Sequence, residues 1–200
     1  MTDTGVTDNG SLEAGLILRA LGGADDRAFG QLVVMHQSRV RALLRRLCDN
    51  IHTADDLAQD VFVIAYQKLS DYRGKGRFSA WLCSIAYRQY LQNHRQRKRE
   101  RDVHAEYGAW QELANGNSTP DADPMHIDLE RALLRLPAPE SAAITLNMTL
   151  GYSHREVATV MQLPPGTVKS HIKRGLEKLK LQLSASAEHN PASAGREKPV

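Results

Sequence analysis

Residues 152–179 have the pattern of two helices joined by a tight turn. Ser153 stands three residues before Glu156, a capping-box spacing that satisfies free amides at the start of a helix. Pro164 and Pro165 end this helix, because proline has no amide donor and clashes with the preceding turn. The pattern predicts a second helix from about Thr167, and it restricts this part of the chain to closely packed short helices.

The second predicted helix has an apolar side and a cationic side. Apolar residues recur every three or four positions, as one buried face requires: Val168, Ile172, Leu176, Leu179 and Leu183. Other positions carry polar or cationic side chains: Lys169, Ser170, Lys173, Arg174 and Lys180. A solvated surface helix has the same pattern. The capping box, the proline break and the short preceding helix favour instead a helix-turn-helix whose second helix enters the major groove of DNA.

The rest of the chain predicts an all-α fold with two small helical domains, because helical periodicity recurs and no strand alternation is found. We expect a disordered start, a four-helix first domain, a flexible acidic linker, a second helical domain and a disordered tail. Their boundaries are 1–10, 11–101, 102–126, 127–183 and 184–200. The linker prediction depends on residues 114–124, which are rich in turn formers and carry only acidic charge.

The positive charge is concentrated in two places, although the formal net charge is only +3. Residues 88–101 contain six Arg or Lys against one Glu, and residues 163–183 contain five against one. Two basic segments suggest two contacts with phosphate backbones. Neither a membrane-span pattern nor a signal-peptide core is found in the sequence, so we expect a cytoplasmic protein.

Two alternatives involve metal ions. Cys48 and His52 are four residues apart, as two zinc ligands on a helix would be, but no second ligand pair has suitable spacing. We therefore expect Cys48 and Cys83 to be buried, reduced thiols. The carboxylates of Asp55, Asp56 and Asp60 would be the best support for a metal-dependent enzyme, but no convergent ligands accompany them. We expect no metal, no cofactor and no catalytic residue.

A predicted helix at residues 53–69 has a polar arc opposite its apolar one. The polar arc contains Asp56, Gln59 and Asp60, with Val63 exposed between them. A merely solvated face and a docking surface with an apolar centre both fit this pattern.

The next predicted helix, from about residue 79, is apolar or aromatic nearly all round at first and strongly cationic after Leu91. The cationic end of such a helix can contact a phosphate backbone that lies beside the helical bundle. Aromatic residues among the cations can also stack on unpaired bases. Phe78 and Trp81 fit equally well as core residues.

Four fragments together resemble the extracytoplasmic-function (ECF) sigma factors of bacterial RNA polymerase, in the family's order and at roughly its spacing. The fragments are DDRAFGQL, DDLAQDVFVIAYQKL, FSAWLCSIA and GYSHREVATVMQLPPGTVKSHIKRG. The resemblance covers about residues 12–183 and implies sigma regions 2 and 4 only, with promoter DNA and core polymerase as partners. It also implies an anti-sigma factor that covers the same surfaces.

The resemblance implies a role for each cluster of residues. Core-polymerase docking falls on Asp56, Gln59, Asp60 and Val63. Nine residues would capture a flipped base and open the −10 element: Tyr72, Arg73, Lys75, Arg77, Phe78, Trp81, Arg88, Gln92 and Arg95. Contact with the −35 element falls on Thr167, Lys169, Ser170, His171, Lys173 and Arg174. Arg88, Gln92 and His171 differ from the residues common in the family, as does Ser141.

A conventional dimeric helix-turn-helix regulator is the competing interpretation, because such proteins have similar C-terminal domains. It would bind a two-fold symmetric site without polymerase.

Overall fold

The structure, a computed structural model, describes residues 5–22, 25–106 and 124–188. Every regular element in these ranges is helical, which confirms the predicted all-α fold. The chain divides into two compact units, and we describe each by itself. None of the described helices is long and apolar enough to cross a membrane.

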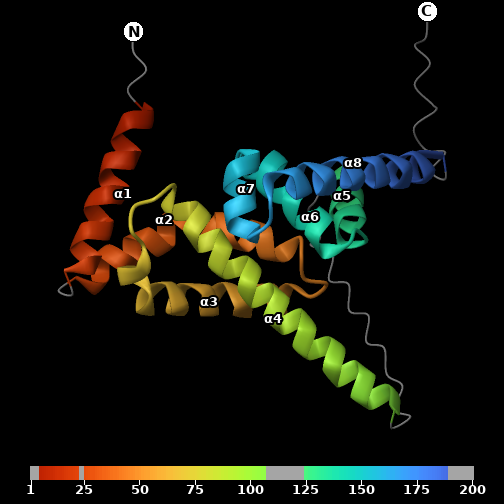
Figure 1. Ribbon diagram of the computed structural model, residues 1–200, viewed down its shortest axis with the longest axis horizontal. Helices are drawn as coiled ribbons and strands as arrows, with labels where there is room; N and C mark the ends of the chain where they lie inside the picture. Colours follow the sequence, from red (N-terminus) through yellow and green to blue (C-terminus); the bar gives the residue numbers. More distant parts are fainter. Residues whose placement is uncertain (1–4, 23–24, 107–123, 189–200) are drawn as a thin grey trace, which may run out of the picture. The chain divides into compact units, whose positions relative to one another are not determined.

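The first unit contains four α-helices (Figure 1). They are α1 (Gly5–Leu21), α2 (Asp26–Arg45), α3 (Ile51–Gln67) and α4 (Phe78–Glu106), with a short 3₁₀ turn, η1 (Leu69–Asp71), after α3. Helices α2, α3 and α4 pack against one another, and α1 packs on α2. Their core contains fully buried side chains from three helices: Leu32, Val40, Leu43, Leu44, Val61, Phe78 and Leu82.

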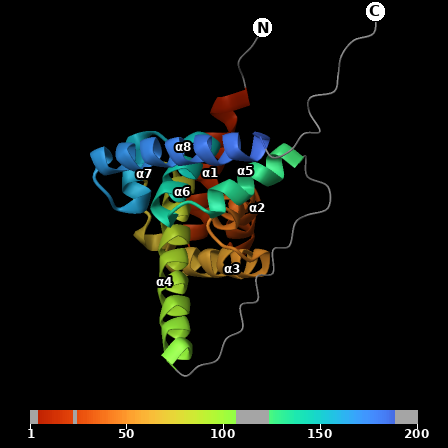
Figure 2. The same ribbon diagram turned by 90° about the vertical axis from the view of Figure 1, so that its right-hand side faces the viewer.

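Helix α4 is 29 residues long, or about 43 Å at 1.5 Å per residue. Its first half belongs to the core, and its second half extends away from the other helices of its unit (Figures 1 and 2). Residues 94–100 are all exposed. One continuous helix is therefore buried along its first half and exposed and cationic toward its end, as predicted.

The second unit contains α5 (Pro124–Leu134), α6 (Ala138–Ile144), a π-helical turn η2 (Thr145–Thr149), α7 (His154–Met161) and α8 (Pro165–Glu188). Helix α8 packs against α5, α6 and α7. One cluster of its core joins α5, α6 and α8: Ala132, Leu133, Leu136, Ile144 and Leu179, with Leu183 packed against it.

Several helix ends differ from the prediction. Helix α1 begins at Gly5, within the stretch expected to be disordered, and α8 continues to Glu188, beyond the expected end at residue 183. Helix α4 runs to Glu106 and α5 begins at Pro124, so the described helices take up both ends of the expected linker. Once a helix is nucleated, each added residue gains a hydrogen bond. A helix can therefore continue beyond the apolar pattern from which it was predicted. The centre of the linker and the end of the tail lie outside the described residues.

Candidate nucleic-acid interface

The predicted capping box is present at the start of α7. The backbone amide of Glu156 donates to the Ser153 hydroxyl at 3.3 Å, and the Ser153 amide donates to the Glu156 carboxylate at 2.8 Å. Gln162 ends α7 in the left-handed conformation, with a φ of 56°, and the Leu163 amide donates to the Ala158 carbonyl at 3.0 Å. Helix α8 then begins at Pro165, a first-turn position where the missing amide costs little.

The buried face of α8 differs from the predicted stripe at one position. Val168, Ile172 and Leu179 are buried, but Leu176 is 38% exposed. Gly175 faces α6 instead: a Cβ at this position would lie 2.6 Å from Ile144 Cδ1 and 3.2 Å from Glu140 Cβ. The contact with α6 is thus closer than a leucine permits, and it rotates Leu176 toward solvent.

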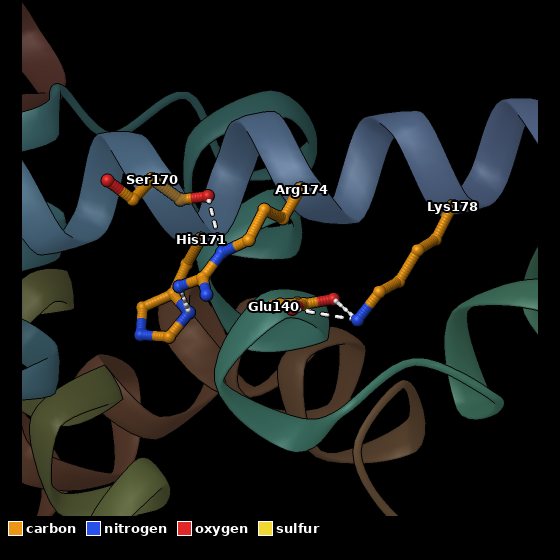
Figure 3. A network of polar contacts seen from close by, with 5 residues as sticks. All are labelled: Glu140, Ser170, His171, Arg174 and Lys178. Atoms are coloured by element: carbon orange, nitrogen blue, oxygen red, sulfur yellow. Dashed lines mark hydrogen bonds and ion pairs between the residues drawn. The ribbon is translucent and has the colours of Figure 1, made fainter.

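The residues predicted to meet the −35 element lie together on α8. Lys169, Ser170, Lys173 and Arg174 are exposed, and Thr167 and His171 are half-buried. Their side chains are partly ordered by the helix itself (Figure 3): Arg174 Nε donates to the Ser170 carbonyl at 3.3 Å, and its Nη2 lies 3.4 Å from His171 Nδ1. This arrangement is a cationic helix face on which Arg174 is held close to the backbone.

An ion pair between a buried carboxylate and an exposed lysine lies next to this face. Glu140 of α6 is 5% exposed, and both of its carboxylate oxygens accept from Lys178 Nζ, at 3.0 and 2.9 Å (Figure 3). Burial and the Arg174 guanidinium lower the pKa of His171, while the Glu140 carboxylate opposes them. The sequence analysis missed Glu140, because an acidic residue in a first helical turn normally signals only a favourable helix dipole.

The polar arc of α3 is exposed as predicted. Asp56, Gln59 and Asp60 are exposed, and Val63 is 56% exposed between them. Asp55 differs from these residues: its carboxylate lies 3.3 Å from Arg45 Nη2 and 3.5 Å from Arg41 Nε, both on α2. Asp55 therefore faces α2, and it does not converge with Asp56 and Asp60 as a metal site would require.

The loop between η1 and α4 carries three of the predicted −10 residues on its surface. Arg73, Lys75 and Arg77 are exposed, and Gly74 and Gly76 take φ values of 69° and 82°, which other residues rarely adopt. The Tyr72 hydroxyl donates to the Gly76 carbonyl at 2.8 Å and closes the loop. On α4, Arg88, Gln92 and Arg95 are exposed, and Arg88 Nε donates to the Ser84 carbonyl at 3.0 Å.

Phe78 is a core residue in this structure, one of the two alternatives that the sequence left open. It is 1% exposed and serves as the buried base of the loop. Its ring lies 5.3 Å from Trp81 and 5.0 Å from Tyr72, both of which are half-buried. These three aromatic residues form one cluster.

Comparisons with known proteins match both units. The family model described as Sigma-70 region 2 matches residues 32–100, and that described as Sigma-70, region 4 matches residues 126–179. The RNA polymerase sigma-H factor of Pseudomonas aeruginosa is 32% identical over 163 residues, which cover 76% of this chain and 84% of that protein. The ECF RNA polymerase sigma-E factor of Escherichia coli is also 32% identical over 163 residues, covering 76% and 85%.

Two solved structures are similar in fold. The sigma factor RpoE of Bartonella quintana, in complex with the anti-sigma factor NepR, has a TM-score of 0.67 at 26% identity, covering 78% of this chain and 96% of that one. CnrH, in complex with the cytosolic domain of CnrY, has a TM-score of 0.64 at 26% identity, covering 87% and 98%.

The cationic helix-turn-helix and these matches define a transcription initiation factor that binds promoter DNA. The chain belongs to the sigma-70 family and is an ECF sigma factor built from regions 2 and 4. It therefore binds core RNA polymerase and directs promoter-specific initiation, as the sequence analysis predicted.

Proposed function

We propose that three faces of this sigma factor divide the work of initiation. The polar arc of α3 docks on core polymerase. The loop of residues 72–78 and the exposed side of α4 capture and open the −10 element. The cationic face of α8 reads the −35 element. The observation that best supports this division is the α8 face, where predicted DNA-contacting side chains lie together on a preorganised helix-turn-helix.

The composition of the α3 arc supports docking. An exposed valine surrounded by acidic and amide side chains gives an apolar centre within a polar rim, as in many protein interfaces. An acidic surface also repels DNA phosphates, so this face suits a protein partner better than the promoter. The carboxylates of Asp56 and Asp60 lie on the exposed arc, whereas Asp55 pairs with arginines within the unit.

We infer further that an anti-sigma factor holds the protein inactive by covering these faces. The complex of RpoE with the anti-sigma factor NepR supports this inference by similarity of fold. We infer no catalytic activity: the protein acts in the cytoplasm with the polymerase, which performs the chemistry.

The docking assignment is tested by Asp60→Arg. A reversed charge left unpaired in an interface costs several kcal/mol, so we expect core affinity to fall by about a hundredfold or more while the fold is retained. The matched control is Asp49→Arg, an exposed aspartate outside the arc, in the connection that precedes α3. Binding to labelled core polymerase is the measurement, with circular dichroism to check the fold. Wild-type affinity in Asp60→Arg overturns the assignment.

The −35 assignment is tested by Lys173→Ala combined with Arg174→Ala. Each lost phosphate contact lowers the slope of log K against log salt by about one. We expect the holoenzyme to bind a promoter more weakly and with a smaller salt slope, while core affinity stays unchanged. On a promoter with a scrambled −35 element the loss should disappear. Tight binding of the chain alone to a symmetric site would instead indicate a dimeric regulator.

A further inference from the structure

Helix α1 precedes the residues that the region 2 model matches, and the functions proposed above give it no role. It packs on α2 and also contacts η1, the turn that leads into the loop of residues 72–78 (Figure 1). We call this loop the capture loop. Because α1 contacts the turn before this loop, α1 can influence the conformation of the loop as well as the packing of the bundle.

A buried polar contact joins α1 to the interior of the unit. His36 of α2 is 7% exposed, and its Nε2 lies 2.7 Å from Oε1 of Glu13 on α1. Burial is the main cause that lowers the pKa of His36, Arg39 lowers it further, and the Glu13 carboxylate opposes both. The ring is therefore neutral near pH 7. Its Nε2 meets the Glu13 carboxylate in a close polar contact that lacks the geometry of a hydrogen bond.

The same histidine contacts the aromatic cluster that supports the capture loop. The ring of His36 lies 5.4 Å from Phe78, edge to face at 62°. Phe78 in turn contacts Tyr72 at 5.0 Å, and the Tyr72 hydroxyl closes the loop on the Gly76 carbonyl. Burial and the Glu13 carboxylate both raise the pKa of Tyr72, so Glu13 acts on both ends of this series of contacts.

We propose that Glu13 and His36 are positioning residues for the capture loop: through Phe78 and Tyr72, they hold the loop in the shape that receives a base of the −10 element. A buried polar pair costs desolvation, and an apolar pair of similar size can stabilise a core equally well. What a polar pair adds is orientation, because the close carboxylate favours one direction of the ring over others. This inference rests on the proposed −10 function of the loop.

The test uses holoenzyme assembled from core polymerase and the full chain. The probes are forked promoter DNAs with a single-stranded −10 element, either intact or carrying one abasic site at successive positions. Tyr72→Ala serves as the loop variant and identifies the captured position, since its loss of affinity should vanish on one abasic probe. Glu13→Ala removes the carboxylate, and His36→Phe keeps a ring against Phe78 but removes the polar contact.

We expect Glu13→Ala and His36→Phe to lower affinity for the intact probe by roughly threefold to tenfold, the range of coupling through packed side chains. On the abasic probe identified with Tyr72→Ala, both variants should bind as wild type does. The control is Leu18→Ala, at a residue of α1 that is 70% exposed, and it should match wild type on every probe. A role limited to stabilising the fold would weaken binding to all probes alike.

Three results overturn the inference. If Tyr72→Ala shows a base-dependent loss but Glu13→Ala and His36→Phe do not, the loop captures a base without help from α1. An equal loss on intact and abasic probes assigns the pair to the fold alone. If Tyr72→Ala shows no base-dependent loss at all, the proposed function of the loop fails, and the inference fails with it.

Discussion

The two parts of this sigma factor that we propose to face DNA are held in shape in different ways. The start of α7 and the polar face of α8 are shaped by contacts between near neighbours in sequence, such as Ser153 with Glu156 and Arg174 with Ser170, although α8 also packs closely on α6. In the capture loop it depends on contacts between distant residues, because Phe78 packs against His36 of α2 and His36 meets Glu13 of α1.

This difference suggests a different vulnerability for each part. Local capping and turn contacts form as soon as the helices do, so the helix-turn-helix needs only its own core. The capture loop takes its shape only when α1, α2 and α4 are packed together. We therefore expect changes within the second unit to affect the helix-turn-helix, and distant changes within the first unit to affect the loop.

The largest effect that we expect in the second unit comes from Gly175→Ala. The new Cβ would lie 2.6 Å from Ile144 Cδ1, and Ile144 is itself buried, so either this side chain must repack or α6 and α8 must shift, at a cost of about 1–3 kcal/mol. The matched control is Gly166→Ala on the same helix, where a Cβ meets nothing within 4 Å. Hydrogen exchange of α6 and α8 amides measures the difference; equal protection in the two variants would contradict the close approach.

A smaller effect is expected from Ser153→Ala, which removes the capping hydroxyl of α7. Loss of such a cap typically costs about 1 kcal/mol, and the amide of Glu156 loses its acceptor. Hydrogen exchange in the first turn of α7 should increase, and −35 binding should weaken by less than in the Lys173 and Arg174 variant. Ser184→Ala, an exposed serine late in α8, is the control. Unchanged exchange in α7 would show that the cap is dispensable.

The smallest effect concerns pH and the first unit. The pKa of His36 is lowered in the folded protein, so the unfolded chain binds its proton more readily. The stability that neutral His36 contributes is present above the unfolded pKa, near 6.5, and is lost as the pH falls below it toward the folded value. Arg39 and Glu13 are the charged groups that act on this ring.

We expect wild type to lose more stability than His36→Gln between pH 7.5 and 5.5, as measured by thermal unfolding. The pKa of His171 is also lowered, but His171 is present in both proteins, so its contribution cancels. Equal pH dependence of the two proteins would contradict the burial of a neutral His36.

Much of the site was predictable because its signals are local. The α3 arc and the α8 cations follow from helical spacing, and both are exposed as predicted. The exposure of Leu176 was missed, and the two roles of Phe78 stayed open, because a helical wheel shows which residues share a side, but not how closely a neighbouring helix approaches. No sequence pattern predicts the contacts of Glu140 and Glu13. Each contact is found only in the folded structure, where Glu140 lies beside Lys178 and Glu13 lies beside His36.

The order of residues along the chain was enough to define a helical protein with a DNA-binding helix pair, because caps, prolines and apolar periodicity act within a few positions. Only the tertiary structure decided that Gly175 rather than Leu176 meets α6, that Phe78 is buried under the loop, and that α1 reaches His36. These features depend on the close packing of side chains from different helices, and packing at that scale depends on shape and distance rather than on the class of each residue.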